Sequence, residues 1–291
     1  KKLFMKRDLR FRNCFKALVV MVFFGIGNLG FGQISISSTT PVTENFTIGT
    51  LATASLPSNW KISPAGASSP TWSAAGNLTA TVNAASSGSP TASGAYNWGN
   101  ATTTTDRAIG ISSSGSYASP NSIMAYYKNT SGIQINDIEM SFDYERYRIN
   151  SAACSITFFT STDGVVWTAR TAGDSGAFST GSSAYNFTTG TVVSKSFTLS
   201  GLNIPNNGNL YLRWNFNTTG ANSQGVGLDN VSLTATFAMT PITWISTGWS
   251  NTVGPDATTD AFIAAPFNTT THGAITAKNL TIATGGSLTV N

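Results

Sequence analysis

The stretch that decides the fold is Met140-Ser141-Phe142-Asp143-Tyr144-Glu145-Arg146-Tyr147-Arg148-Ile149. It holds two acidic residues and two arginines in ten positions, in a chain that is only 10% charged. With the two-residue period of a strand, one face carries Met140, Phe142, Tyr144, Arg146 and Arg148, and the other carries Asp143, Glu145 and Tyr147. The pattern predicts a central strand whose charged side chains are paired across a sheet.

The rest of the chain favours strands over helices. It contains 17 Phe, 8 Tyr and 7 Trp among many Thr, Ser, Gly and Asn residues, a mixture that suits strands and turns. Strand patterns recur at residues 122–128, 134–148, 153–161, 192–199, 210–216 and 227–238, separated by turn signals such as Thr162-Asp163-Gly164. We therefore expect an all-β protein, an antiparallel jelly-roll-like β-sandwich, with a bulge at Asp229-Asn230.

Residues 1–32 have the pattern of an export signal. A basic segment precedes the apolar run Ala17-Leu18-Val19-Val20-Met21-Val22-Phe23-Phe24, and Gly30-Phe31-Gly32 supplies small residues before a cleavage point. The apolar run is too short and too rich in glycine for a membrane span. We expect cleavage near Gly32, a mature chain without a membrane span, and a secreted or cell-surface protein.

The charge of the chain resides in this leader. Seven of the 16 basic residues lie in the first sixteen positions, which leaves nine basic and eleven acidic residues for the remainder. No basic stripe remains to bind phosphates, so nucleic acid is excluded as a partner. Cys154 is the single cysteine after the leader, and its alternation with Ile156 and Phe158 predicts a buried apolar role.

Composition changes after Phe237, and three regions follow: the signal at 1–32, the β-sandwich module at 33–238, and a second region at 239–291. Short strand patterns joined by Gly285-Gly286 are typical of the rungs of a β-solenoid. We expect residues 239–291 to be the start of a β-repeat domain, truncated here from a longer, multidomain protein.

Six motifs in order resemble a known family: Leu56-Pro57-Ser58-Asn59-Trp60, Asp106-Arg107-Ala108-Ile109-Gly110, Lys128-Asn129-Thr130-Ser131-Gly132, Tyr144-Glu145-Arg146-Tyr147-Arg148, Leu212-Arg213-Trp214 and Gly227-Leu228-Asp229-Asn230-Val231. The stretch from about 43 to 237 resembles the β-sandwich modules of large exported bacterial proteins, of the cleaved-adhesin and choice-of-anchor type. The resemblance implies a non-catalytic adhesion module, and implies export by the type IX route. It assigns no catalytic residue.

The candidate ligand-binding residues are Tyr96, Trp98, Asp106, Arg107, Glu145, Arg148 and Arg213. Tyr96-Asn97-Trp98 lies in a polar stretch and is the best candidate for a platform that stacks on sugar rings. The charged members either brace the strands by ion pairs and hydrogen bonds, or line a pocket in which arginine faces an anionic ligand. The first of these two readings is favoured by the low charge content.

Two further chemistries remain open. Asp143 and Glu145 share a strand face, with Cα atoms about 6.5–7 Å apart, which overlaps the spacing of about 6.5–9.5 Å between the carboxylates of inverting glycosidases. A structural calcium ion is a second option, with Asp163 and Asp229 as weak candidates; no other cofactor is expected. His272 stands without a cysteine nearby and is read as a turn residue.

The leading hypothesis is a non-catalytic extracellular adhesion or structural module whose partner is a glycan or a surface protein. A carbohydrate-binding module that uses loop aromatics is the first alternative, and exposed, coplanar Tyr96 and Trp98 would favour it. A glycan-active hydrolase that uses Asp143 and Glu145 is the second, and a cleft containing both carboxylates would favour it.

Overall fold

The computed structural model describes residues 33–49, 55–74, 83–85, 93–100, 106–187, 191–238 and 241–291. The expected export signal lies outside these ranges. The regular secondary structure of the described residues is almost entirely strand, which confirms the all-β class. In these ranges no helix has the length and apolar character needed to cross a membrane.

The first sheet has seven strands, and its main path runs in the order β1-β7-β14-β9-β10. Its members are β1 (Ile34–Ile36), β3 (Trp60–Ile62), β7 (Asn121–Asn129), β9 (Cys154–Ser161), β10 (Thr168–Ala169), β11 (Gly176–Phe178) and β14 (Asn209–Asn217). Strand β3 pairs with β7, and β11 pairs with β9. All pairs are antiparallel except β1 with β7.

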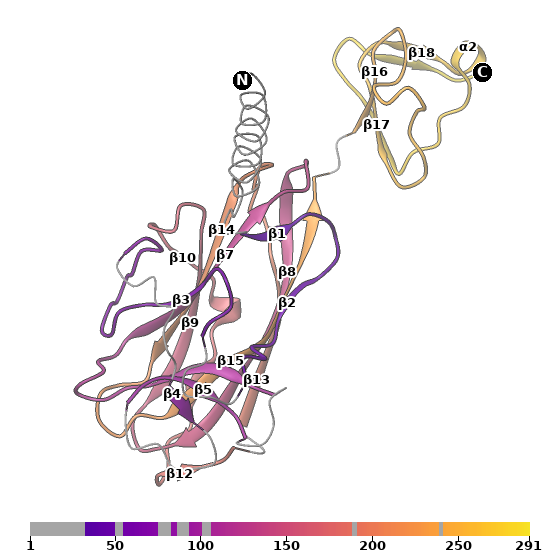
Figure 1. Cartoon of the computed structure of the whole chain (residues 1–291). Coiled ribbons are helices and arrows are strands. Elements are labelled where there is room, and N and C mark those ends of the chain that lie inside the picture. The colour runs from indigo at the N-terminus through magenta and orange to yellow at the C-terminus, as the bar shows by residue number, and fades with distance from the viewer. Residues whose placement is uncertain are drawn as a thin grey trace, which may run out of the picture.

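The second sheet has eight strands, and its main path runs in the order β12-β8-β15-β6-β5-β4 (Figure 1). Its members are β2 (Val42–Glu44), β4 (Asn83–Ala85), β5 (Gly94–Trp98), β6 (Ala108–Ser112), β8 (Ile135–Ile149), β12 (Ala184–Tyr185), β13 (Thr191–Leu199) and β15 (Gly225–Phe237). Strand β13 pairs with β8, and β2 pairs with β15. The long strands β8 and β15 form the middle of this sheet.

The core lies between the two sheets. Met140, Phe142 and Tyr144 of β8 are buried on its inner face, as their alternation predicts. The Phe142 ring lies 5.4 Å from that of Phe158 on β9 and 5.6 Å from that of Trp214 on β14, so residues of both sheets share one core. Each such ring contributes about 1.5–3 kcal/mol by leaving water.

Cys154, at the start of β9, belongs to the same core. It is a free cysteine, and burial raises the pKa of its thiol to about 12. The prediction that Cys154 serves as a small apolar residue is therefore confirmed.

Two local predictions are also confirmed. The pairing of β15 with β8 shifts register between Asp229 and Ser232, and Asn230 there has φ 52°, which is the expected bulge. The turn at Asp163 joins β9 to the antiparallel β10, as its hairpin signal predicts. The Asp163 carboxylate accepts hydrogen bonds from the amides of Val165 and Val166, so it caps this turn.

Residues 241–291, yellow in Figure 1, form two small parallel sheets of their own. One contains β16 (Ile242–Trp244), β17 (Asp260–Ile263) and β19 (Asn279–Ile282), and the other contains β18 (Pro266–Asn268) and β20 (Ser287–Thr289). The short helix α2 (Thr269–His272) follows β18. Parallel pairing of short strands is compatible with a β-solenoid. That residues 239–291 begin a β-repeat domain stays a prediction.

Candidate functional site

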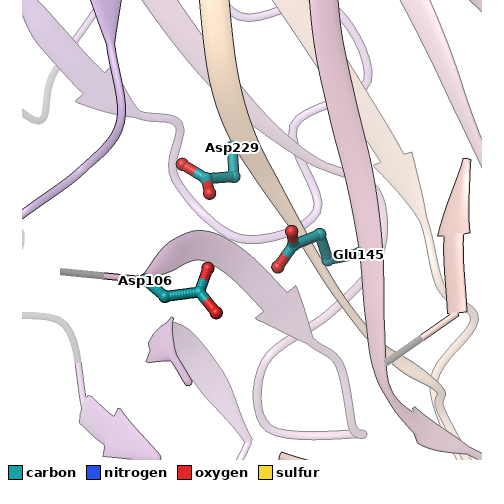
Figure 2. A group of neighbouring side chains, drawn as sticks. All are labelled: Asp106, Glu145 and Asp229. Atoms are coloured by element: carbon teal, nitrogen blue, oxygen red, sulfur yellow. The ribbon is translucent and has the colours of Figure 1, made fainter. Parts of the chain in front are cut away.

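Three carboxylates meet on the outer face of the second sheet. Asp106, Glu145 and Asp229 each offer an oxygen, and these oxygens all lie within 4.8 Å of one another. Figure 2 shows the three side chains directed toward one another. The chain segments that carry them are neighbours in the sheet, because β15 lies between β8 and β6.

The strand register explains this meeting. Asp229 on β15 stands opposite Asp143 on β8, and Gly227 stands opposite Glu145. Opposite residues of an antiparallel pair share a face, so Asp229 lies on the face of β8 that carries Glu145. Asp106 comes two residues before β6, which pairs with the other side of β15.

The three acidic residues of the cluster differ in their exposure to solvent. Asp229 is only 2% exposed, Glu145 is half-buried and Asp106 is exposed. Burial, with the negative charges of Glu145, Asp106 and Asp143, raises the pKa of Asp229 to about 8. Burial also raises the pKa of Glu145, whose Oε2 accepts a hydrogen bond from the Tyr147 hydroxyl.

Arg107 is fully buried, and its hydrogen bonds go to neutral oxygens and not to the carboxylates of this cluster. Its Nε donates to Asn97 Oδ1 at 3.0 Å, its Nη1 donates to the Asn100 carbonyl at 2.8 Å, and its Nη2 donates to the Asn97 carbonyl. The expected pairing of Arg107 with an acid is thus replaced by hydrogen bonds to neutral oxygens, which hold the chain after β5.

Arg146 and Arg213 also have neutral partners. Arg146 donates to the Ser179 carbonyl at 2.8 Å and to Thr191 Oγ1 at 3.0 Å. The Arg213 guanidinium lies 4.0 Å from the centre of the Phe159 ring and 5.0 Å from that of Trp167. Burial lowers the pKa of Arg213 to about 10, and its role is to pack between two rings.

Arg148 lines a polar cavity of about 340 Å³. The other lining residues are mostly small and polar: Ser93, Ser112, Ser113, Ser114, Ser116, Gly220, Ala221, Asn222 and Ser223. The Arg148 guanidinium lies 5.1 Å from the Tyr185 ring centre, and Nη2 donates to Ser183 Oγ at 3.4 Å. Its Nε is buried and has no hydrogen-bond partner in the part of the chain that the structure describes.

The platform expected at Tyr96 and Trp98 is not exposed. The two rings are stacked with centroids 4.5 Å apart, but Tyr96 is 1% exposed and Trp98 is 0% exposed. Trp98 fits because the sheet beneath it is formed by glycines: a Cβ on Gly110 or Gly225 would lie 2.6–2.8 Å from the indole. The pair is therefore part of a small core on the outer face, together with Ala108 and Tyr147.

A second aromatic group joins Trp72 and Tyr126, two of the aromatic residues that could stack on sugars, with Tyr211. Tyr126 of β7 and Tyr211 of β14 are stacked with centroids 4.6 Å apart, and Trp72 packs on both at 5.8 and 5.6 Å. Lys61 Nζ lies 4.2 Å above the Trp72 ring. Tyr126 and Tyr211 stand opposite each other in the antiparallel pairing of β7 with β14. In the sequence, the two-residue alternation of each strand indicates which face each tyrosine occupies.

Asp143 and Glu145, the expected hydrolase pair, have different surroundings. Asn230 Nδ2 donates to Asp143 Oδ2 at 3.0 Å, whereas Glu145 belongs to the cluster with Asp106 and Asp229. Neither residue lines the Arg148 cavity or a second cavity of about 200 Å³ next to Arg170.

The chain matches no protein-family model and no curated protein. Among solved structures, the K3 cleaved adhesin domain of Lys-gingipain from Porphyromonas gingivalis w83 aligns at 14% identity and TM-score 0.38, over 66% of this chain and 98% of its own. The K1 domain of the same protein aligns at 15% identity and TM-score 0.35, over 68% and 99%. TmCBM61, solved with β-1,4-galactotriose, aligns at 11% identity and TM-score 0.26, over 45% and 72%. Similarity this distant says nothing of ligand or activity, which have to be inferred from this chain's own side chains.

Proposed function

We propose that residues 33–238 form a non-catalytic extracellular adhesion module that binds acidic glycans in the Arg148 cavity. The observation that supports this most directly is that Arg148, a partly buried arginine, lines a cavity otherwise walled mostly by serine residues. A hydrogen bond between a charged donor such as a guanidinium and a ligand acceptor contributes about 1.5–3 kcal/mol.

The chemistry of the cavity suits a sugar that carries a carboxylate. A guanidinium is the side chain that best matches a carboxylate, because its N–H groups form a fork of parallel donors. Serine hydroxyls both donate and accept, as sugar hydroxyls do. The cavity volume of about 340 Å³ lies in the range of small-ligand sites, so one or two sugar rings fit.

The cavity rim is held by its own hydrogen bonds. Ser93 Oγ lies 2.5 Å from Ser114 Oγ, and Ser114 Oγ lies 3.0 Å from Ser116 Oγ. The Ser113 amide donates to Ser223 Oγ at 2.9 Å. These bonds fix the hydroxyl positions before a ligand arrives, which lowers the entropic cost of binding. The leader pattern of residues 1–32 supports an extracellular setting in a larger protein.

A glycan array with the full chain tests the proposal. Polymers that contain uronic acids should bind, and neutral polymers of the same linkage should bind at least about 10-fold more weakly, since a charged hydrogen bond contributes about 1.5–3 kcal/mol. Arg148→Ala should remove the preference for acidic glycans. Arg170→Ala is the matched control, because it removes one positive charge beside the other cavity.

Three outcomes would overturn the proposal: no binding to acidic glycans, binding that Arg148→Ala leaves unchanged, or binding that Arg170→Ala removes. Hydrolysis of a bound polysaccharide that Glu145→Gln abolishes would instead establish the glycosidase alternative.

A further inference from the structure

The carboxylate cluster of Asp106, Glu145 and Asp229 lies outside the Arg148 cavity and is a candidate for a separate binding site. We propose that Asp106, Glu145 and Asp229 bind a divalent cation, and that the cation is calcium. Three oxygens within 4.8 Å of one another share a centre no more than about 2.8 Å from each. Calcium takes oxygen ligands at about 2.3–2.6 Å, whereas magnesium requires about 2.0–2.1 Å. This upper bound is compatible with calcium distances, and magnesium is disfavoured because it requires near-ideal octahedral geometry and gives up its water ligands reluctantly.

A second observation is independent of the clustering. Asp229 is 98% buried, and its Oδ1 has no hydrogen-bond partner among the residues that the structure describes. Figure 2 shows one oxygen of its carboxylate on the side of Glu145 and Asp106. Buried carboxylates are paired, bound to a metal or protonated, so the incompletely satisfied carboxylate of Asp229, beside two other carboxylates, calls for a cation or a proton.

The arginines nearby in the sequence do not supply that occupant. The guanidinium of Arg107 is directed at Asn97 and Asn100, that of Arg146 at Ser179 and Thr191, and that of Arg148 at Ser183 and Tyr185. The alternative to a cation is a proton held by one of the three carboxylates. The two are distinguishable because a metal binds the deprotonated carboxylates and is displaced in acid.

The surroundings prepare the cluster for a cation. The Tyr147 hydroxyl donates to Glu145 Oε2 and so orients that carboxylate, as groups behind a metal ligand commonly do. Asp229 and Glu145 come from the two central strands, and Asp106 comes from the segment that leads into β6. A bound cation would thus join three adjacent strands on the outer face and fix the chain just before β6.

Calorimetric titration of the EDTA-treated full chain with CaCl2 tests the proposal, with MgCl2 as the competing probe. We expect one calcium per chain that Asp229→Asn weakens at least about 10-fold, because calcium affinity follows the number of charged ligands. Asp143→Asn is the matched control: it removes the same charge from the same sheet face, on a carboxylate outside the cluster. Calcium should also raise the midpoint of thermal unfolding in the wild type and in Asp143→Asn, and not in Asp229→Asn.

The proposal is overturned if the wild type binds no calcium, if Asp229→Asn and Asp143→Asn titrate alike, or if magnesium binds as tightly. If Asp229→Asn does not fold, Asp106→Asn replaces it, since Asp106 is exposed. Arg148→Ala should leave the calcium titration unchanged, so failure of the glycan proposal would not affect this one.

Discussion

The indole of Trp98 lies nearly parallel to the phenol ring of Tyr147, with centroids 5.7 Å apart and an interplanar angle of 7°. Trp98 ends β5 and Tyr147 lies on β8, and β6 and β15 run between these strands in the sheet. The contact is reached because Gly110, Gly225 and Gly227 present no side chain beneath the indole. A single tryptophan thus ties four strands together on the face opposite the main core.

Trp98→Ala should therefore destabilise the sandwich strongly. Truncation of a fully buried tryptophan leaves a cavity, and we expect the free energy of unfolding to fall by about 3–5 kcal/mol. Urea unfolding followed by far-ultraviolet circular dichroism measures the loss. Trp72→Ala is the control, because Trp72 is partly exposed and should cost clearly less. Equal losses for the two variants would contradict the bracing role of Trp98.

Gly110→Ala should destabilise by steric overlap. A Cβ at this position would lie 2.0 Å from the Val226 carbonyl and 2.6 Å from the Trp98 ring. Overpacking typically costs about 1–3 kcal/mol, and a clash with backbone belongs at the upper end. Gly115→Ala is the matched control, because nothing lies within 4 Å of the Cβ position there. Thermal unfolding should separate the two variants, and a neutral Gly110→Ala would count against the strand packing described above.

Asp229 should make the metal-free protein less stable as the pH rises. Its pKa is raised to about 8 in the folded state, by burial and then by Glu145, Asp106 and Asp143, against an ordinary value near 3.9 when unfolded. Between about pH 4 and pH 8 the folded state therefore holds the extra proton. The free energy of unfolding should fall with rising pH in this window, by up to about 1.4 kcal/mol per unit.

Urea unfolding of the EDTA-treated protein at pH 5, 6, 7 and 8 measures this slope. The ionisable groups that act on Asp229 are Glu145, Asp106, Asp143 and Tyr147, while a hydrogen bond from the Asn230 amide opposes the rise of its pKa. The charge of Arg107 acts on Asp106. Asp229→Asn cannot titrate, so its profile should be flatter than that of the wild type. A wild-type stability that rises from pH 5 to pH 8 would show that Asp229 ionises normally.

Arg107→Ala should destabilise although Arg107 forms no ion pair with any residue that the structure describes. The guanidinium donates to three oxygens of Asn97 and Asn100, and its removal takes three charge-assisted hydrogen bonds away from them. We expect a loss of about 3 kcal/mol in the free energy of unfolding, measured by urea titration. Arg107→Lys should recover only part of it, since an ammonium cannot reproduce the fork of donors. Full recovery by lysine would mean that charge alone matters.

Much of the fold could be predicted because it depends on local pattern. The alternation of Met140, Phe142 and Tyr144 identified the inner face of β8. The slip at Asp229-Asn230 identified the bulge, because an extra residue interrupts the two-residue period. Such signals lie within one strand, so they are legible without knowledge of its neighbours.

The candidate site could not be assembled in the same way. Asp106, Glu145 and Asp229 were each singled out, but their meeting depends on β15 pairing with both β8 and β6, which no single stretch encodes. The burial of Trp98 likewise depends on glycines in other strands, two of them more than a hundred positions away. Polar neighbours in the sequence suggested an exposed loop there, whereas the sheet placed both rings in a second core.

The burial of Cys154 makes the protein its own reporter of opening. Its thiol is enclosed in the core at the start of β9, and the pKa of about 12 keeps it in the unreactive protonated form at neutral pH. A maleimide added to the native protein would reach this sulfur only when the packing around the start of β9 opens. The labelling rate at Cys154 therefore reports how often the core around this residue opens, without an engineered probe.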